Sequence, residues 1–385
     1  MSNARETKAA TMDVRTGGSR IAGEIDRVGR DRRRLRAWLA IVVLAIGALV
    51  IVGGATRLTH SGLSMTKWHP IHGVVPPLNQ AEWQEEFAGY KQIPEYRELN
   101  PDMTLAGFKG IFWWEWSHRL LARSVGILFA VPLAFFWLSG RLESRLKAPL
   151  VGIFLLGGLQ GFIGWWMVSS GLADRTDVSQ YRLATHLTLA CIILAAIAWV
   201  YAGLSAKPRD EAAPNWLVWL AGLVALDVFL QIYLGGLVSG LDAGFSYNTW
   251  PLMDGAIVPH DLFTMEPVWR NFFENPKCVQ FLHRTNAYLL WTLIAVQMIV
   301  TLATVPRARH ANRAMVLFVL VTVQAVFGIT TLLLEVPIDW ALLHQGGAIV
   351  VLLAAVMHCR GLVGTCPRPG EDAIGEGQGR LSRPA

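Results

Sequence analysis

Four of the ten histidines in this chain stand near the start of apolar segments, where an imidazole could bind a metal. They are His118, His186, His283 and His344. A polar side chain inside a bilayer is costly and usually marks a functional site. A single membrane histidine could be a hydrogen-bonded packing residue. Four of them at equivalent depths indicate a shared chemical role.

Pairs of histidines favour heme as the bound group. Helical bundles build cofactor sites from side chains on facing helices, and neutral imidazole is a good axial ligand of heme iron. Zinc would need three or four clustered ligands, but each half of the chain offers two histidines with no repeated cysteine or carboxylate beside them. We therefore expect His118 with His186 at one iron, and His283 with His344 at another.

An arginine follows the first histidine of each pair. The segment 115–119 reads Glu-Trp-Ser-His-Arg, and the segment 280–284 reads Gln-Phe-Leu-His-Arg. A guanidinium pairs well with carboxylates, so Arg119 and Arg284 are expected to bind the propionates of a heme near the outer face. The alternative is that both are arginines whose charged heads reach the membrane interface.

The two motifs differ in one charge. Glu115 lies three residues before His118 and hence on the same helical face, whereas Gln280 is the neutral counterpart before His283. A carboxylate beside only one of two similar sites is a candidate general base or a stabiliser of developing positive charge. The structural alternative is an ion pair with Arg119 or Arg123. This asymmetry predicts chemistry in the first half of the chain.

The elements that must position these residues are transmembrane helices. The 385 residues are 53% hydrophobic and only 16% charged, below the roughly 25% charged residues of soluble domains. Long apolar blocks approach the roughly 20 residues that cross a bilayer. The sequence predicts an all-α integral membrane protein with eight transmembrane helices at residues 37–54, 125–138, 149–168, 184–204, 216–238, 288–305, 315–334 and 340–357.

The positive charges predict the orientation in the membrane. Arginines and lysines gather before the first apolar block and in the loops 141–147 and 306–313, which the positive-inside rule places in the cytoplasm. Both termini are then cytoplasmic, and the loops 60–112 and 240–278 face outward. We expect an inner (plasma) membrane location, and the net charge of +6 is no nucleic-acid signal. Residues 1–36 are expected to form a disordered, arginine-rich tail.

An internal repeat predicts two halves. Residues 53–64 read GGATRLTHSGLS and residues 235–246 read GGLVSGLDAGFS, and the same offset pairs Trp68 with Trp250. Gln160 and Gly164 also match Gln324 and Gly328. Repeats of four spans run parallel in the membrane. We predict two pseudo-symmetric four-helix bundles, at 37–204 and 216–360, joined by a cytoplasmic linker at 205–215 and followed by a cytoplasmic tail at 361–385.

Together these motifs resemble the heme A synthase family. The resemblance covers about residues 37–360 and rests on Glu-x-x-His-Arg at 115–119, its echo at 283–284, the later histidines and the stretch 53–64. It implies that the second half holds heme b on His283 and His344. The first half would receive heme O near His118 and His186, with Glu115 essential to the reaction.

The resemblance also implies the reaction. The C8 methyl group of heme O would become a formyl group through successive hydroxylations, giving heme A for terminal oxidases. A heme b with two histidine ligands is suited to passing electrons. A membrane heme O synthase and an electron donor or acceptor are candidate partners. Some bacterial members carry a cysteine pair in the first outer loop, but residues 60–112 contain none, so no disulfide is carried over.

Two other functions remain compatible with parts of the pattern. A di-heme b cytochrome for electron transfer would use the same four histidines, but it offers no reason for Glu115 opposite Gln280. A transporter would place polar groups at mid-depth. The remaining histidines are weaker candidates: the outer loops hold residues that bind propionates or are simply solvated (His60, His69, His72 and His260), and the inner surface holds residues expected to be solvated (His310 and His358).

Overall fold

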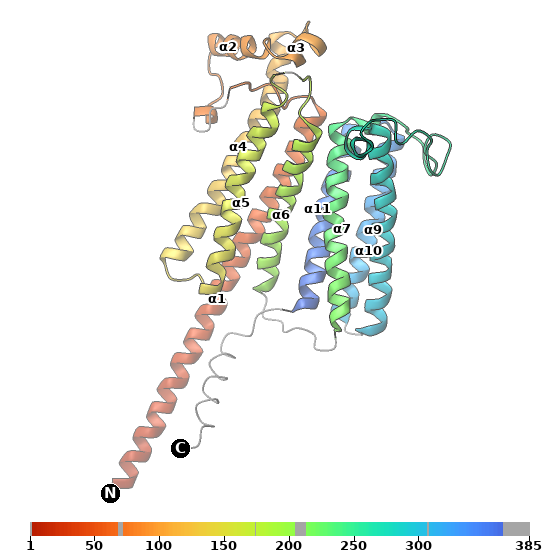
Figure 1. Ribbon diagram of the computed structural model, residues 1–385. Helices are drawn as coiled ribbons and strands as arrows, with labels where there is room; N and C mark the ends of the chain where they lie inside the picture. The colour runs from red at the N-terminus through yellow and green to blue at the C-terminus, as the bar shows by residue number, and fades with distance from the viewer. Residues whose placement is uncertain (1, 68–71, 174, 205–212, 306–307, 365–385) are drawn as a thin grey trace.

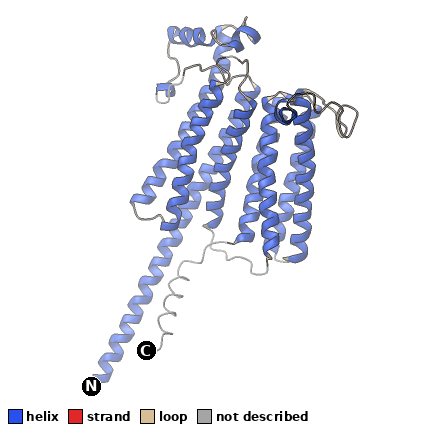
Figure 2. Cartoon of the chain, in the orientation of Figure 1, coloured by secondary structure: helices blue, strands red, loops and turns tan. Residues whose placement is uncertain are grey.

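The computed structural model describes residues 2–67, 72–173, 175–204, 213–305 and 308–364. Within these ranges the chain is helical and has no strand (Figure 2). Eight long helices carry the fold: α1 (Ser2–Leu58), α4 (Leu105–Leu138), α5 (Ser144–Ser169), α6 (Gln180–Gly203), α7 (Asn215–Gly240), α9 (Pro276–Thr304), α10 (Ala308–Leu333) and α11 (Ile338–Val363).

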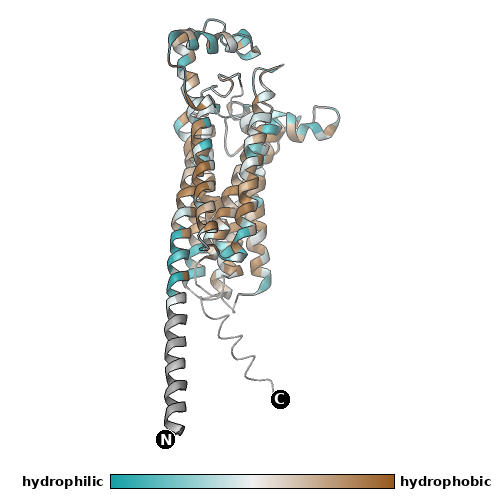
Figure 3. Ribbon diagram, turned by 90° about the vertical axis from the view of Figure 1, so that its left-hand side faces the viewer, coloured by the Kyte–Doolittle hydropathy of each residue, from teal (hydrophilic) through white to brown (hydrophobic). Residues whose placement is uncertain are grey.

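Each long helix is long and apolar enough to cross a membrane, α1 by its part from Asp26 to Leu58. Figure 3 shows hydrophobic residues along the middle of the bundle and hydrophilic residues toward its ends. A spanning segment must satisfy its backbone polar groups internally, and a helix does so. The prediction of an all-α, eight-span membrane protein is confirmed for the described residues, and the chain is a multi-pass membrane protein.

Short helices lie at the end of the molecule opposite the start of α1 (Figure 1). The loop between α1 and α4 contains η1 (His72–Val74), α2 (Gln80–Tyr90) and α3 (Pro94–Leu99). The loop between α7 and α9 contains η2 (Ala243–Phe245), η3 (Val268–Arg270) and α8 (Asn271–Glu274). Both long predicted outer loops therefore contain short helices. We call the loop between α1 and α4 the first outer cap and the loop between α7 and α9 the second outer cap.

The first helix begins earlier than the sequence analysis predicts. Residues 2–36, predicted to be a disordered tail, form the start of α1, which projects beyond the other spans (Figure 1). This segment contains no proline and holds nine arginines and four alanines, which are good helix formers. Charge patterning alone therefore hid a strong helical propensity. Residues 205–212 of the predicted linker and 365–385 of the predicted tail lie outside the described residues.

The spans form two groups with matching contacts. In the first group α1 contacts α4 and α6, and α5 contacts the same two helices. In the second group α7 contacts α9 and α11, and α10 contacts those two. The groups meet where α6 contacts α7 and α11 and where α1 contacts α11. This pattern favours the two pseudo-symmetric bundles expected from the repeat, whose exact boundaries stay a prediction.

Small residues bring the two groups together. A Cβ atom at Gly236 of α7 would lie 2.8 Å from Ala184 Cα of α6, so glycine permits this close approach. At the matching place in the first half, Gly54 leaves room for the side chain of Gln345, which donates to Val50 O at 2.9 Å. Arg57 in the last turn of α1 and Asp242 in the loop after α7 add an ion pair of 2.9 Å.

Candidate functional site

The second pair of histidines faces across the bundle. His283 comes from α9 and His344 from α11, and their ring centroids are 6.4 Å apart with planes at 85°. Metal–imidazole bonds are about 2 Å long, so two rings bound to one metal have centroids about 6 Å apart. The two rings are therefore spaced to share one iron.

All four histidines lie against a glycine of the preceding span. The closest ring atom would lie 2.7–3.2 Å from a Cβ atom built on that glycine, which is tighter than ordinary contact. Any larger residue would displace the imidazole, so the glycines cradle the rings. The pairs are Gly53 with His118, Gly164 with His186, Gly235 with His283 and Gly328 with His344.

Three of these glycines follow a glutamine by one helical turn. Gln160, Gln231 and Gln324 donate to the backbone carbonyls of His186, His283 and His344 at 2.9, 3.1 and 2.7 Å. Each amide also lies 3.0–3.4 Å from a ring nitrogen of the same histidine. Neighbours of this kind orient metal-bound imidazoles. The glutamines were not predicted as site residues, although the repeated Gln-x-x-x-Gly spacing at 160, 231 and 324 could have revealed them.

Buried atoms without partners lie in the same sites. Within the described residues, Gln160 Oε1 and His186 Nδ1 are both buried without a hydrogen bond, as is Gln324 Oε1. Such groups are costly unless a ligand or a small movement satisfies them. An imidazole that binds iron through one ring nitrogen carries a proton on the other, and that proton needs an acceptor. The donor set therefore fits heme ligation by histidine.

Glu115 of α4 is buried, with only 2% of its surface exposed. Its Oε2 atom accepts hydrogen bonds from Ser64 Oγ at 2.8 Å and from the Met65 N–H at 2.7 Å. Its Oε1 atom forms an ion pair with Arg119, whose guanidinium also donates to Met65 O at 3.0 Å. The ion pair expected as the structural alternative is therefore present, and every partner favours the charged carboxylate.

Gln280 of α9 occupies the corresponding place with the opposite polarity. Its amide nitrogen donates to Ala243 O at 2.7 Å and to Ser246 O at 2.6 Å. Arg284 donates to Tyr247 O at 2.9 Å, as Arg119 does to Met65 O. Two further nitrogens of Arg284, Nε and Nη1, are buried without a partner among the described residues. With no carboxylate beside it, Arg284 can bind a propionate.

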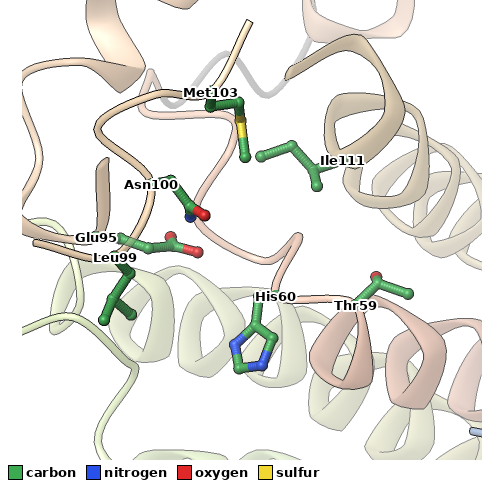
Figure 4. A pocket seen from close by; sticks show the side chains of 7 residues that line it. All are labelled: Thr59, His60, Glu95, Leu99, Asn100, Met103 and Ile111. Carbon is green, nitrogen blue, oxygen red and sulfur yellow. The ribbon is translucent and has the colours of Figure 1, made fainter. Parts of the chain in front are cut away.

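A cavity of about 300 Å³ lies under the first outer cap, lined by Thr59, His60, Glu95, Leu99, Asn100, Met103 and Ile111 (Figure 4). Glu95 is only 3% exposed, and its Oε2 atom is without a hydrogen bond among the described residues. Burial raises the pKa of Glu95 to about 8; Asp177 and Glu115 add to the rise, and Arg57 opposes it. Ile111 lies one turn before Glu115, so this cavity approaches the carboxylate site.

The other histidines differ in their surroundings. His60 lines the cavity, and His260 is exposed. His72 begins η1, with only its backbone described, and His69, like Trp68, lies outside the described residues. The expectation that His310 and His358 are solvated is wrong, because they are 0% and 1% exposed. His358 lies 3.0 Å from the amide of Gln297, so the inner end of the second bundle contains a buried polar contact that hydropathy alone does not reveal.

Zinc-type clustering does not occur in the part of the chain that the structure describes, where no three His, Cys, Asp or Glu residues could hold one metal ion. Eight apolar spans together with paired, cradled histidines define the class: a multi-pass membrane protein with candidate heme sites between its helices.

Comparisons with known proteins identify the family. The family model described as cytochrome oxidase assembly protein (COX15-CtaA) matches residues 36–356. A protein named Heme A synthase from Sinorhizobium fredii (strain NBRC 101917 / NGR234) is 62% identical over 349 residues, covering 91% of this chain and 95% of that protein. Another, from Rhizobium meliloti (strain 1021), is 61% identical and covers 90% and 94%. The chain belongs to the cytochrome oxidase assembly protein family.

Proposed function

We propose that this chain converts heme O to heme A by oxidising the C8 methyl group to a formyl group. Relatives that carry the name Heme A synthase and match almost the whole chain support this activity. The two halves are proposed to have different functions, and the observation that supports this is the difference between Glu115 and Gln280 at otherwise matching places. One half carries an anion beside its histidines, and the other carries a neutral amide.

The second half is the proposed site of a permanent heme b. His283 and His344 would hold it, and Arg284 would bind a propionate with its unpartnered nitrogens. A heme held by two histidines would supply electron transfer. Gly235 and Gly328 keep space for the two rings, and Gln231 and Gln324 orient them.

The first half is the proposed substrate site. His118 and His186 would hold heme O, and Glu115 lies one helical turn before His118. Because Ser64, Met65 and Arg119 all donate to Glu115, it is held as an anion. These contacts favour a role for Glu115 as a negative charge that stabilises the methyl carbon as it becomes electron-poor. A role as a general base is less favoured, because Glu115 would first have to release one of its hydrogen-bond partners. Both O₂ and water are compatible sources of the oxygen.

The proposed location is the inner (plasma) membrane, with both termini cytoplasmic. The distribution of arginine and lysine supports this orientation, and the start of α1 and the end of α11 lie on the same side of the bundle (Figure 1). The glutamate and arginine sites then lie near the outer face. A membrane heme O synthase would deliver the substrate, since a farnesylated heme is poorly soluble in water, and an electron donor or acceptor would complete the reaction.

Expression in a host that makes heme O but no heme A tests the activity. Extraction of total heme and reverse-phase chromatography should reveal heme A when this chain is present and none when Glu115→Gln replaces it. Membranes that contain the full-length wild-type chain, its bound heme and abundant heme O, but no heme A, would contradict the proposal.

A second function is favoured by one observation. The contact between a glycine and a histidine recurs at all four sites, as expected for a di-heme b cytochrome in which both hemes carry electrons. That function predicts two heme B molecules per chain and no effect of Glu115 on any product. Heme analysis of the purified protein separates the two.

A further inference from the structure

Polar side chains of α7 and α9 form a hydrogen-bonded network next to His283. Gln231 contacts this histidine at its carbonyl and ring, and the Asn286 amide donates to Gln231 Oε1 at 3.0 Å. Asp227, one turn before Gln231 on α7, is 6% exposed, and Asn286 is 9% exposed. Gln231 and Asn286 are thus hydrogen-bonded in series behind one imidazole, in a region where polar groups are costly.

The first half replaces this whole network with apolar residues. The repeat places Leu49 opposite Gln231 and Ala45 opposite Asp227, and the alignment of the two His-Arg motifs places Leu121 opposite Asn286. Leu49 lies one turn before Gly53, on the helical face that meets His118. Within the described residues no glutamine amide contacts His118, although one contacts each of the other three histidines.

The orientation of the His118 ring differs as well. At Gly164, Gly235 and Gly328 the ring atom nearest to a built Cβ would be Cε1 of the facing histidine. At Gly53 the nearest atom would be His118 Nε2, at 3.0 Å. The one histidine without a glutamine is therefore also the one whose ring is turned differently. These two observations are independent, since one concerns residue types and the other concerns geometry.

We infer that Gln160, Gln231 and Gln324 are positioning residues for three iron ligands, and that Leu49 leaves His118 as the exchangeable ligand of the first half. This inference rests on the proposed function and deepens it. A permanent heme b benefits from two oriented ligands, whereas a substrate heme must enter and leave. His186, oriented by Gln160, keeps hold of the iron while His118 binds and releases it.

Heme transfer from the purified chain tests this inference. The full-length protein in detergent is loaded with two equivalents of protoheme and mixed with excess apomyoglobin, which captures released heme and changes the absorbance. The wild type should release one heme fast and one slowly, with the slow phase absent in His344→Ala. Since loss of an orienting neighbour weakens metal binding about 10- to 100-fold, Leu49→Gln should slow the fast phase by a factor in that range.

Gln231→Leu is the reciprocal variant and should accelerate the slow phase by a similar factor. Leu49→Met, which adds no hydrogen bond, should leave both phases unchanged. An unchanged slow phase in Leu49→Gln reports that the fold is intact, and Gln231→Leu gives an independent answer if Leu49→Gln does not fold. Wild-type rates in both Leu49→Gln and Gln231→Leu would overturn the inference.

The assay needs no turnover, so it separates this inference from the proposed function. Reciprocal changes in release rate without any heme A in the expression test would leave the ligand assignment standing and contradict the activity. Heme A production with unchanged release rates would support the activity and contradict the ligand assignment.

Discussion

Beneath the second outer cap, Gln280 donates to two loop carbonyls, whereas Glu115 at the same place in the first half accepts from a hydroxyl and a backbone N–H. The loop that follows α7 presents acceptors, and the loop that follows α1 presents donors. The loop groups that contact each side chain therefore match it: donors face the Glu115 carboxylate, and acceptors face the Gln280 amide. The first outer loop is thus arranged to bind an anionic side chain from α4.

Hydrogen bonds behind the histidines differ in the opposite way, because the second half has more of them than the first. In the second half Gln231 contacts His283 and Asn286 donates to Gln231, whereas the first half has Leu49 and Leu121 at these two places. Charge is thus concentrated beside the proposed substrate site of the first half, and orienting hydrogen bonds are concentrated behind the proposed ligands of the second. One half is suited to changing what it binds and the other to keeping it.

Removing the charge that distinguishes the halves should have the largest effect. Glu115→Gln copies the second half, and we expect heme A formation to fall about 10²- to 10³-fold, the range for loss of one group that stabilises charge in the transition state. The spectrum of heme b should stay intact, because His283 and His344 are untouched. Chromatography of extracted heme measures the product. Gln280→Glu is the reverse control. A normal yield of heme A from Glu115→Gln would contradict the proposed role of Glu115.

Filling a histidine cradle should affect binding next most strongly. A Cβ atom at Gly328 would lie 2.7 Å from His344 Cε1, so Gly328→Ala should displace this ligand. We expect heme b affinity to fall about 10- to 100-fold, as when a ligand loses its orientation. Heme per chain in the purified protein measures the loss. Gly222→Ala is the matched control, since nothing lies within 4 Å of its built Cβ, and equal heme loss in both variants would contradict a cradle.

The buried Glu95 predicts a pH dependence confined to the first outer cap. Its pKa rises from an ordinary 4.5 to about 8 on folding, so the folded chain binds the proton more tightly than the unfolded chain. The stability due to Glu95 is present at low pH and is lost as pH rises toward 8. Melting curves between pH 5 and 9 should show this slope in the wild type and a weaker one in Glu95→Gln. Identical slopes would mean that the Glu95 carboxylate is solvated in the folded chain, and this would contradict the prediction.

The smallest effect is expected where the halves meet. Arg57 pairs with Asp242 at 2.9 Å, and the Asp242 side chain is 43% exposed. Ion pairs with an exposed partner contribute about 0–1 kcal/mol, so Asp242→Asn should lower the melting temperature by only a few degrees. Asp26→Asn is the control, since its partner Arg30 lies on the same helix. Separation of the two bundles in Asp242→Asn would mean that this ion pair, rather than the packing of α6 against α7, holds them together.

The sequence predicts the spans and histidines well because both have strong local signals. Long apolar blocks predict helices, and the repeated His-Arg motif places His118 and His283 at matching depths. Hydropathy misled for residues 2–36, where helix formers outweigh polarity, and for His310, whose burial depends on neighbouring helices. The donors to Glu115 could not be predicted, because Ser64 and Met65 reach it only through the fold of the first cap.

The distribution of heme types between the halves shows whether the first half holds substrate and the second half holds a permanent heme b. Wild type, His118→Ala with His186→Ala, and His283→Ala with His344→Ala would each be purified with heme O available, and their hemes extracted and separated by reverse-phase chromatography. We expect heme B to disappear only from the second-half variant, and heme O or heme A to disappear only from the first-half variant. Two heme B molecules per wild-type chain, one lost from each variant, would contradict this expectation and indicate a di-heme electron-transfer cytochrome.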